Sequence, residues 1–277
     1  MIAPKTVFMT GCSSGIGYAT AIELKKRGHR VICSVRKSED IGRLQTEGFE
    51  CLNLDLADSG SIQQAVQTLI TMTDGRVDAL FNNGAFGQPG AVEDLSREVL
   101  RNQFETNFFG THELTNLLIP LMRRQGHGRI IYNSSLLGFV ALKFRGAYNA
   151  SKFALEGLAD TLRLELRGTG IHVVLIEPGP IESLFRQNAF AMYRKHIVPE
   201  HSFHRDAYLS MESRLQKPGP AAPFTLPATA VAEKVIHAVE SPKPKSRYPV
   251  TFPTYLFAYL KRLLPTVLLD KILVSVN

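Results

Sequence analysis

The chain has 277 residues, a hydrophobic content of 44% and a charged content of 21%, which are ordinary values for a soluble globular protein. This length fits one α/β domain with a large core, and the sequence contains no internal repeat and no low-complexity tract. The formal net charge is +7, but the basic residues are scattered and form no arginine-rich block with interleaved aromatic residues, so we do not expect nucleic-acid binding.

The chain opens with a strand, a helix and a second strand. An apolar run over residues 5–9 predicts a buried strand, and a helix with an apolar face follows from Ile16 until Gly28. Residues 29–35 predict the second strand. The opening is thus a βαβ unit of about 30 residues, which is the setting that a nucleotide-binding glycine motif requires.

Three glycines, Gly11, Gly15 and Gly17, lie between the first strand and the body of the helix. They permit a tight turn and a close approach of the backbone, and the N-terminus of the helix offers unpaired N–H groups to a pyrophosphate. Their spacing is G-x-x-x-G-x-G, whereas the commoner dinucleotide fingerprint is G-x-G-x-x-G. We expect a dinucleotide site here, and a Gly/Ser turn without a ligand is the alternative.

The residue after the second strand distinguishes the two nicotinamide dinucleotides. A carboxylate there would accept a hydrogen bond from the ribose 2′-hydroxyl of NAD, whereas a cation accommodates the 2′-phosphate of NADP. The strand ends at Val35 and is followed by Arg36 and Lys37, with no carboxylate before Glu39. The sequence therefore predicts NADP(H) rather than NAD(H), and an exposed basic turn is the alternative.

The next part of the chain repeats the order of strand and helix. The predicted strands cover residues 50–54, 77–81, 128–133 and 171–176, and the predicted helices cover residues 59–72, 96–124 (bent near Gly110) and 146–167. This order predicts a parallel, doubly wound α/β sheet. In such open sheets ligands bind at the carboxyl edge, where Ser135 and Pro178-Gly179 follow the ends of strands.

A tyrosine and a lysine share one face of the helix over residues 146–167. Tyr148 and Lys152 are four residues apart, which is roughly 6 Å along the helix axis, and Ser135 comes thirteen positions before the tyrosine. Tyrosine is a poor acid or base near neutral pH because its pKa is about 10, but a neighbouring ammonium favours the phenolate and lowers that pKa. Such a tyrosine could exchange a proton with a carbonyl or alcohol oxygen that Ser135 holds.

The pattern changes after Ser183. Helices are predicted over residues 184–194 and 228–240, and a polar stretch with four prolines between residues 218 and 227 separates them. This segment is too long for an ordinary loop and predicts an inserted lid. The aromatic residues of its first helix face either the substrate or the core, and the sequence does not decide between the two. They are Phe185, Phe190 and Tyr193, with Met192 beside them.

Residues 246–251 predict a final edge strand, where a proline is tolerated. The apolar tail that follows, residues 254–274, is interrupted by Lys261, Arg262, Pro265, Asp270 and Lys271. Charges at these points argue against a transmembrane span. Packing on the protein's own core, peripheral contact with a membrane and an interface with another subunit are the three alternatives.

These elements predict one domain with three parts. The domain covers residues 1–277 and contains a nucleotide-binding and catalytic core (1–185), a substrate lid (186–245) and a C-terminal strand with an apolar tail (246–277). Because the three cysteines form no C-x-x-C pair and no long apolar leader follows Met1, we expect a reducing, cytoplasmic setting. His201 and His204 have a metal-ligand spacing, but no pattern of Cys, Asp or Glu completes a site, so we expect no metal.

Several motifs occur together in an order that is typical of one family. They are Thr10-Gly11…Gly15-Ile16-Gly17, Asp55-Leu56, Asn82-Asn83, Asn107, Ser135, Tyr148/Lys152 and Pro178-Gly179. Over residues 5–185 the chain therefore resembles the short-chain dehydrogenases/reductases, which have a Rossmann-type fold. The extension that ends at Thr251 resembles the branch of 17β-hydroxysteroid dehydrogenases, retinol dehydrogenases and bacterial aldehyde reductases.

The resemblance implies a role for each matched position. Tyr148 would be the acid/base, Ser135 would hold the reacting oxygen, and Lys152 would bind the nicotinamide ribose and lower the pKa of Tyr148. Asn107 would support a water relay to Lys152. The cofactor-binding residues would be Thr10, Gly11, Ser13, Ser14, Gly15, Ile16, Gly17, Arg36, Lys37, Asp55, Leu56, Asn82, Asn83, Gly84, Tyr148, Lys152, Pro178, Gly179, Ile181 and Ser183. Within that set, Asp55 would contact the adenine, Asn83 the adenosine side and residues 178–183 the nicotinamide face.

One departure from the family pattern occurs at Gly84-Ala85, where the family usually has Ala-Gly. If the second position requires a positive φ or a close backbone approach, alanine there costs about 1 kcal/mol or more. A shift of the turn by one residue would relieve that strain. The departure bears on cofactor affinity more than on the fold.

The sequence thus predicts an NADP(H)-dependent oxidoreductase that transfers a hydride between nicotinamide and a carbonyl or alcohol. The apolar lid favours a hydrophobic substrate such as an aldehyde, a ketone, a retinoid or a steroid. A homo-oligomer, dimer or tetramer, is expected. A non-catalytic NADP(H)-binding regulatory protein is the alternative, and the presence of Ser135, Tyr148 and Lys152 together argues against it.

Overall fold

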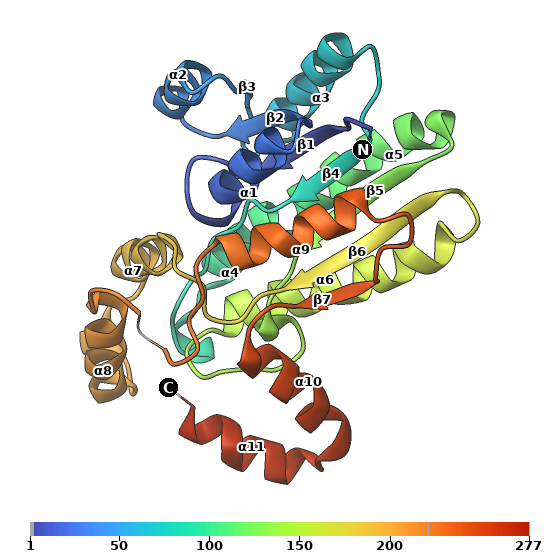
Figure 1. Ribbon diagram of the computed structural model, residues 1–277. Helices are drawn as coiled ribbons and strands as arrows, with labels where there is room; N and C mark the ends of the chain where they lie inside the picture. Colours follow the sequence, from blue (N-terminus) through green and yellow to red (C-terminus); the bar gives the residue numbers. More distant parts are fainter. Residues whose placement is uncertain (1–2, 221, 277) are drawn as a thin grey trace.

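The computed structural model describes residues 3–220 and 222–276 and is built on a seven-stranded sheet between two layers of helices (Figure 1). The strands are β1 (Thr6–Thr10), β2 (Arg30–Val35), β3 (Glu50–Asn53), β4 (Ala79–Asn82), β5 (Gly128–Asn133), β6 (Ile171–Glu177) and β7 (Arg247–Pro249). All neighbouring strands are parallel, in the order β3-β2-β1-β4-β5-β6-β7, so the direction of winding reverses between β1 and β4. The predicted doubly wound parallel sheet is confirmed.

Helices cover both faces of the sheet. One face carries α1 (Gly15–Lys26), α2 (Ser38–Thr46) and α9 (Thr229–Glu240), and the other carries α3 (Ser59–Thr73), α5 (Gly110–Gln125) and α6 (Gly146–Glu165). Alternating residues of the strands supply the two cores, because successive side chains of a strand point to opposite faces. In β1, for example, Phe8 belongs to the core under α3 and α5, whereas Val7 and Met9 belong to the core under α1 and α9.

The long helix that the sequence predicts over residues 96–124 is divided. It consists of α4 (Arg97–Phe104), a π-helical turn (Glu105–Phe109) and α5. At Gly110 a Cβ would lie 1.7 Å from the carbonyl oxygen of Leu56, so the backbones approach too closely for any side chain. This approach explains the glycine at position 110, and the π turn that precedes it holds Asn107.

The predicted lid is more helical than the sequence suggested. It contains α7 (Phe185–His196) and α8 (Arg205–Gln216), which lie side by side at one end of the molecule (Figure 1). α8 was not predicted. Tyr208, Met211 and Leu215 recur at helical spacing and pack with Tyr193 of α7 in a separate small core.

The C-terminal part begins with the predicted edge strand, which is shorter than expected and pairs in parallel with β6. Two helices follow, α10 (Phe252–Leu263) and α11 (Thr266–Ser275), and they break at Pro265. Phe257, Leu269 and Leu273 of this pair pack on Leu136 and Leu137 after β5, so the tail is partly packed on its own core. Within residues 3–220 and 222–276, none of the helices has the length and hydrophobicity needed to cross a bilayer.

Candidate active site

The turn between β1 and α1 depends on glycine at three positions. Gly11 and Gly15 have φ angles of +69° and +57°, in the left-handed region that side chains disfavour. At Gly17 a Cβ would lie 2.2 Å from the carbonyl oxygen of Gly11. The predicted tight turn is therefore enforced by backbone conformation at two glycines and by backbone contact at the third.

The N-terminus of α1 opens onto a cavity. Ser14 is the N-cap residue, yet its side chain makes no capping hydrogen bond to the first turn. Ser13, Gly15 and Ile16 line the same cavity. A helix of 12 residues with uncapped N–H groups in the first turn suits a bound anion. A Cβ at Gly15 would lie 3.0 Å from the Cβ of Ser183, so glycine at this position leaves space in the cavity between the two residues. These residues fit the pyrophosphate of a dinucleotide.

Asn83, at the end of β4, connects this turn to the neighbouring strand. Its amide Nδ2 donates hydrogen bonds to the carbonyl oxygens of Thr10 and Gly11, both at 3.0 Å. Its Oδ1 accepts a hydrogen bond of 2.8 Å from Nδ2 of Asn133, and the carbonyl oxygen of Asn133 accepts one of 2.7 Å from Nζ of Lys152. A continuous chain of hydrogen bonds thus joins the glycine turn to Lys152.

The departure at Gly84-Ala85 causes no backbone strain. Neither residue has a positive φ, so that condition for a penalty at Ala85 is not met. Gly84 instead supplies the close approach, because a Cβ there would lie 3.0 Å from the side chain of Leu56 and 3.3 Å from the hydroxyl of Thr10. The glycine is needed one position earlier than the usual family order places it.

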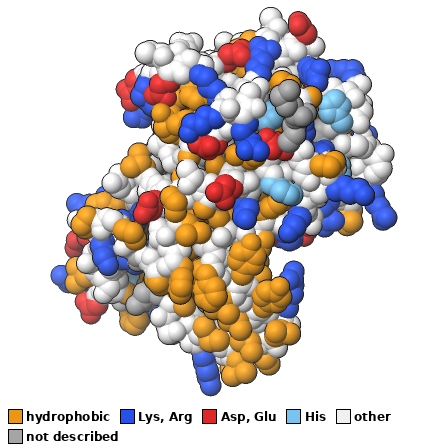
Figure 2. All heavy atoms as spheres, viewed as in Figure 1, with side chains coloured by type: hydrophobic (Ala, Val, Ile, Leu, Met, Phe, Trp, Pro, Cys, Tyr) orange, Lys and Arg blue, Asp and Glu red, His pale blue; other side chains and the backbone are white. Residues whose placement is uncertain are grey.

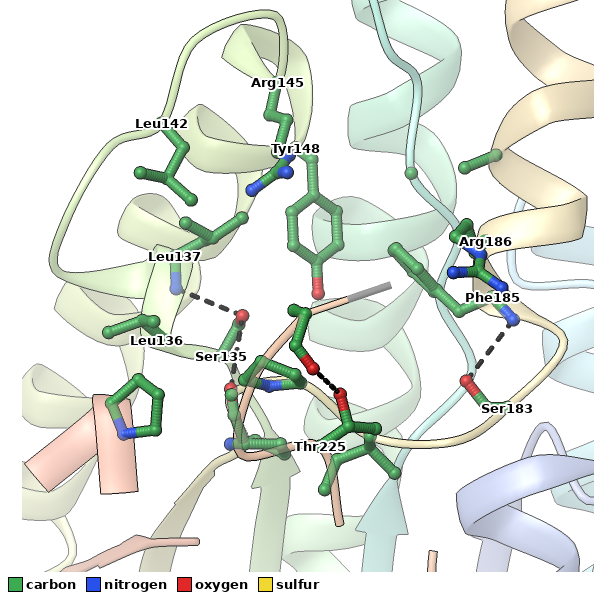
Figure 3. A pocket seen from close by; sticks show the side chains of 18 of the residues that line it. Ser135, Leu136, Leu137, Leu142, Arg145, Tyr148, Ser183, Phe185, Arg186 and Thr225 are labelled. Carbon is green, nitrogen blue, oxygen red and sulfur yellow. Dashed lines mark hydrogen bonds between the residues drawn. The ribbon is translucent and has the colours of Figure 1, made fainter. Parts of the chain in front are cut away.

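Three of the four predicted catalytic residues, Ser135, Tyr148 and Lys152, line the cavity, and Figure 3 shows the first two. The hydroxyl groups of Ser135 and Tyr148 both point into it. The Ser135 Oγ accepts a hydrogen bond of 3.1 Å from the Leu137 N–H and donates one of 3.5 Å to the Pro178 carbonyl oxygen, which fixes its direction. Lys152 is buried, and its Nζ lies 5.7 Å from the centre of the Tyr148 ring.

The predicted effect of Lys152 on the pKa of Tyr148 is wrong. Burial on the cavity wall raises the pKa of Tyr148 to about 12, and the opposing influences come from the Ser135 hydroxyl and the Arg145 guanidinium. Lys152 directs its ammonium to the Asn133 carbonyl oxygen, and burial lowers its own pKa to about 8. Desolvation therefore outweighs charge at both groups, and near neutral pH it keeps the tyrosine in its protonated form.

Asn107 lies in the π turn, buried behind the cavity. Its Oδ1 accepts a hydrogen bond of 3.1 Å from the Phe86 N–H, and its Nδ2 donates bonds of 2.9 Å and 3.2 Å to the Phe86 carbonyl oxygen and to the Ser151 hydroxyl. Ser151 precedes Lys152 in α6. Asn107 thus binds the residue that precedes Lys152, whereas the Lys152 ammonium itself donates to the Asn133 carbonyl oxygen.

The cavity that these residues share has a volume of about 1410 Å³. Most of the predicted cofactor residues line it, namely Gly11, Ser13, Ser14, Gly15, Ile16, Asn83, Gly84, Tyr148, Lys152, Pro178, Gly179, Ile181 and Ser183. The others do not, namely Thr10, Gly17, Arg36, Lys37, Asp55, Leu56 and Asn82. Within the second set, Thr10, Gly17, Leu56 and Asn82 are buried and shape the turn from behind, and Arg36 and Lys37 are exposed beyond the rim.

A third basic residue, Arg43, follows Arg36 and Lys37 in the chain and contacts the glycine turn, which the sequence did not indicate. Lys37 pairs with Glu39 at 3.1 Å, whereas Arg36 is exposed and only its carbonyl oxygen is engaged, by Asn53. Arg43 of α2 donates a hydrogen bond of 2.6 Å to the Ser13 carbonyl oxygen in the glycine turn. Because α2 was not predicted, Arg43 was not recognised as a neighbour of the turn.

Two further residues of the cavity were not assigned from the sequence. Phe185 packs edge-on against Tyr148, with ring centres 5.2 Å apart, so this lid residue faces the cavity, whereas Tyr193 faces the lid core. Arg145 precedes α6 and lies beside the Tyr148 ring (Figure 3). An arginine three residues before the tyrosine was the only sequence signal for it.

The histidine pair in the lid does not assemble a cluster of ligands. His204 Nε2 lies 2.6 Å from the carboxylate of Glu93, and no group of three or more His, Cys, Asp or Glu side chains suited to a metal ion occurs in the described part of the chain. His204 also contacts the Phe144 ring edge-on at 5.5 Å between centres. The histidine thus serves to attach the lid to the segment before α4.

Comparisons with known proteins agree with this geometry. The family model described as short chain dehydrogenase matches residues 5–194. The chain is 43% identical over 272 residues to the oxidoreductase YbbO of Escherichia coli strain K12, covering 98% of this chain and 95% of YbbO. It is 32% identical to human 17-beta-hydroxysteroid dehydrogenase type 1 (95% of this chain, 81% of that protein) and 34% identical to human retinol dehydrogenase 8 (77% and 72%).

Solved structures show the same fold. A short-chain dehydrogenase/reductase from Burkholderia phymatum in complex with NAD superposes with a TM-score of 0.78 at 22% identity, covering 100% of this chain and 97% of that one. A short-chain dehydrogenase from Burkholderia cenocepacia in complex with NADP gives a TM-score of 0.75 at 21% identity, covering 99% and 100%. These two neighbours carry different nicotinamide dinucleotides, NAD in the first and NADP in the second.

Proposed function

Because the chain belongs to the short-chain dehydrogenase family, in which it is an oxidoreductase, we propose that it reduces a carbonyl of a hydrophobic substrate with NADPH, or oxidises the corresponding alcohol with NADP. The observation that carries this proposal is that the Ser135 and Tyr148 hydroxyls point into a cavity that Lys152 and the glycine turn also line. When bound, the nicotinamide supplies or takes up the hydride. The protein's own side chains then have to manage the oxygen and its proton.

Tyr148 is suited to donate a proton to a carbonyl oxygen as it becomes an alkoxide. With its pKa raised to about 12 the phenol carries its proton near neutral pH, which is the form that donates a proton in carbonyl reduction. Ser135, held by the Leu137 N–H and the Pro178 carbonyl oxygen, has its hydroxyl in the cavity and can hold the same oxygen. Lys152 would bind the nicotinamide ribose, and Asn107 would position the segment that carries it.

Substitution of Tyr148 by phenylalanine tests this assignment. Tyr148→Phe should lower kcat for NADPH-dependent carbonyl reduction by about 10²–10⁴-fold because the proton donor is lost. The thermal shift produced by NADPH should be retained, since a ligand that binds the folded state raises the apparent stability by mass action. The control is Tyr259→Phe, at a tyrosine that is 63% exposed on α10. Full turnover by Tyr148→Phe would refute the role of Tyr148.

The preference for NADP(H) rests on the cationic side chains near the end of β2. Arg36 is exposed with no carboxylate paired to it among the described residues, and Arg43 of α2 reaches the glycine turn. Guanidinium groups suit the 2′-phosphate that distinguishes NADP from NAD. A thermal-shift comparison at equal concentrations should show larger stabilisation by NADP, and Arg36→Glu should reverse that order. Stronger stabilisation of the wild type by NAD would contradict it.

The alternative function is a regulatory protein that binds NADP(H) without chemistry. It would show the same thermal shifts but no oxidation of NADPH against any panel of aldehydes and ketones. The chain keeps serine, tyrosine and lysine together in the lining of one cavity, which a pure sensor does not require. This arrangement favours the enzyme.

The lid and the tail support a hydrophobic substrate delivered from a membrane surface. Apolar residues of α10 and α11, Phe252, Leu256 and Leu273 among them, line the mouth of the cavity. Next to them lies an exposed apolar surface that includes Tyr259, Leu263 and Val267, at 63%, 76% and 68% exposure, which Figure 2 shows as a hydrophobic patch over the lower end of the molecule. Residues 186–245 would thus serve as the lid, and residues 252–277 as a peripheral membrane contact of a cytoplasmic protein.

Vesicle sedimentation tests the membrane contact. The full chain with Leu263→Asp and Val267→Asp should bind less to vesicles that contain anionic lipid than the wild type does, with equal thermal stability because both side chains are exposed. Equal sedimentation of the two proteins would exclude this surface.

We also propose that the protein is a homo-oligomer. The apolar side chains Leu117 of α5 and Phe153 of α6 are 37% and 38% exposed and would lie in the interface, and light scattering of the purified protein tests it.

A further inference from the structure

Three half-buried arginines that line the cavity have no carboxylate partner among the residues that the structure describes. Arg145 precedes α6, Arg186 lies in the first turn of α7 and Arg214 in the last turn of α8, and all three line the cavity. None of them lies within 4.0 Å of an Asp or Glu oxygen among the residues that the structure describes. Charged side chains that are withdrawn from water are normally paired, so this set requires an explanation.

The three charges are close enough to affect one another. Burial and, to a smaller extent, the charge of Arg214 together lower the pKa of Arg145 to about 10. Burial also lowers the pKa of Arg214, and the charge of Arg186 adds to that effect. Each guanidinium therefore raises the free energy of its neighbour, and an anion placed among them would lower the free energy of all three.

Arg186 is held in a fixed orientation with a donor left over. Its Nη2 donates hydrogen bonds to the carbonyl oxygens of Lys217 and Gly219, the latter at 2.7 Å, which ties α7 to the end of α8. Its Nε is buried and has no hydrogen-bond partner among the described residues. An N–H group buried without a partner costs free energy, and a bound acceptor would remove that cost.

The remaining lining restricts where such an anion sits. The other charged side chains of the cavity are Lys143, Lys152 and a single carboxylate, Glu182, so the positive sign predominates. The lining also includes the apolar side chains Leu142, Phe144 and Phe185. The cavity thus presents the hydroxyls of Ser135 and Tyr148, apolar side chains and a group of three arginines, of which Arg145 lies beside Tyr148.

We propose that the substrate is an amphipathic carbonyl compound whose apolar chain ends in an anionic group, a carboxylate or a phosphate, that binds Arg145, Arg186 and Arg214. This inference rests on the proposed reductase function and specifies its substrate class. Guanidinium groups bind carboxylate and phosphate through paired, charge-assisted hydrogen bonds, and the fixed fork of Arg186 is prepared for such a contact. Glu182, on the loop before α7, is the one carboxylate of the lining and would disfavour an anion beside its own side chain.

A matched pair of substrates tests the proposal. An ω-oxo fatty acid of medium chain length and its methyl ester differ only in the terminal charge, and the wild-type kcat/KM should be about tenfold or more higher for the acid, as one charge-assisted contact predicts. In Arg214→Met this ratio should fall towards one, and Arg214→Lys should retain part of it. Arg205→Met, which removes an exposed cation of the same helix outside the cavity, should keep the wild-type ratio. Replacement of the carboxylate by phosphate distinguishes the two anions.

Three results would overturn the proposal. They are a wild-type ratio near one, an equal loss on acid and ester in Arg214→Met, and a weakened NADPH affinity in Arg214→Met, because the last would assign the arginine to the phosphates of the cofactor. If neither substrate turns over, the reductase function fails instead. In that case the thermal shift given by a medium-chain dicarboxylate relative to the matching diol still tests the anion site, which predicts a larger shift for the dicarboxylate in the wild type and not in Arg214→Met.

Discussion

The two sides of the cavity are held together by different physical means. On the side of the glycine turn, neutral backbone groups touch directly, with Gly17 and Gly84 leaving no room for a side chain, and Asn83 joins the strands through amide hydrogen bonds. On the side of α6 and β6, the elements are instead held together by ion pairs, two of whose carboxylates are buried. Arg247 of β7 donates to Glu156 of α6, to Glu177 of β6 at 2.5 Å and to Asp160 at 2.6 Å.

This difference predicts how each side responds to change. A close-packed neutral turn has no group that titrates, but a single methyl group would disrupt it. A buried charge network tolerates small changes of shape, but here it depends on pH and on Arg247, the cation that the buried carboxylates of Glu156 and Glu177 share. The chain of hydrogen bonds from Gly11 through Asn83 and Asn133 to Lys152 connects the two sides, so a defect on either should reach the reacting groups.

The largest effect is expected from removal of the cation. Arg247→Met leaves the carboxylates of Glu156 and Glu177 buried without a partner and should lower the free energy of unfolding by about 3–5 kcal/mol. Urea denaturation measures this. The control is Arg30→Met, because Arg30 and Glu50 form an ion pair that is 41% and 39% exposed, and it should cost at most about 1 kcal/mol. Similar losses for the two variants would show that the network does not hold this side.

A methyl group on the glycine turn should have the next largest effect. In Gly17→Ala the new Cβ would lie 2.2 Å from the Gly11 carbonyl oxygen and 2.7 Å from Nδ2 of Asn83, so the turn must shift, at a cost of about 3 kcal/mol and with weaker NADPH binding. Gly157→Ala provides the matched control. A Cβ at Gly157 meets nothing within 4 Å on α6, so it should stabilise the protein by about 0.5–1 kcal/mol. Unchanged NADPH affinity in Gly17→Ala would contradict the close-packing account.

The smallest effect is a pH dependence that only the charged side should show. Burial, with the nearby Glu156 carboxylate, raises the pKa of Glu177 from 4.5 to about 7 in the folded protein, in spite of Arg247. The folded state therefore binds more protons than the unfolded state between these values, and the free energy of unfolding contributed by Glu177 falls as pH rises from about 4.5 to about 7. The slope is at most about 1.4 kcal/mol per pH unit.

Urea denaturation across that interval measures the slope. Glu177→Gln cannot titrate, so its stability should fall less steeply with rising pH than that of the wild type. Glu233→Gln, which alters an exposed carboxylate on α9, should leave the wild-type slope unchanged. Parallel curves for the wild type and Glu177→Gln would show that Glu177 is ionised throughout this range.

The two sides also differ in how far the sequence predicts them. The glycine turn was predicted because a positive φ at Gly11 and Gly15 and a close backbone approach at Gly17 each require glycine, and the spacing of these glycines is visible in the sequence. The strands were predicted because both faces of the sheet are covered by helices. Alternate residues of each strand fill two separate cores, so the whole strand appears in the sequence as a continuous apolar run. The ion network around Arg247 joins residues 70 to 91 positions apart, and no local pattern reports such a pairing.

The remaining differences have similar causes. α2 buries only Leu44 and so has little periodicity to detect, and α8 was obscured by the prolines that follow it. The sign of the pKa shift at Tyr148 depends on burial in the folded protein, whereas the spacing of Tyr148 and Lys152 shows only that they are near each other. The three arginines of the cavity, Arg145, Arg186 and Arg214, come from the start of α6 and from α7 and α8, so no local sequence pattern predicts that they line one cavity.

The central claim is that both sides of the cavity act on one reacting carbonyl. Reduction of a hydrophobic aldehyde with NADPH that carries deuterium at C4 of the nicotinamide tests it most directly. With the wild type we expect an alcohol that carries deuterium on the former carbonyl carbon, and with Tyr148→Phe almost none in spite of bound NADPH. Binding of NADPH by the wild type without deuterium transfer to any member of a carbonyl panel would contradict it.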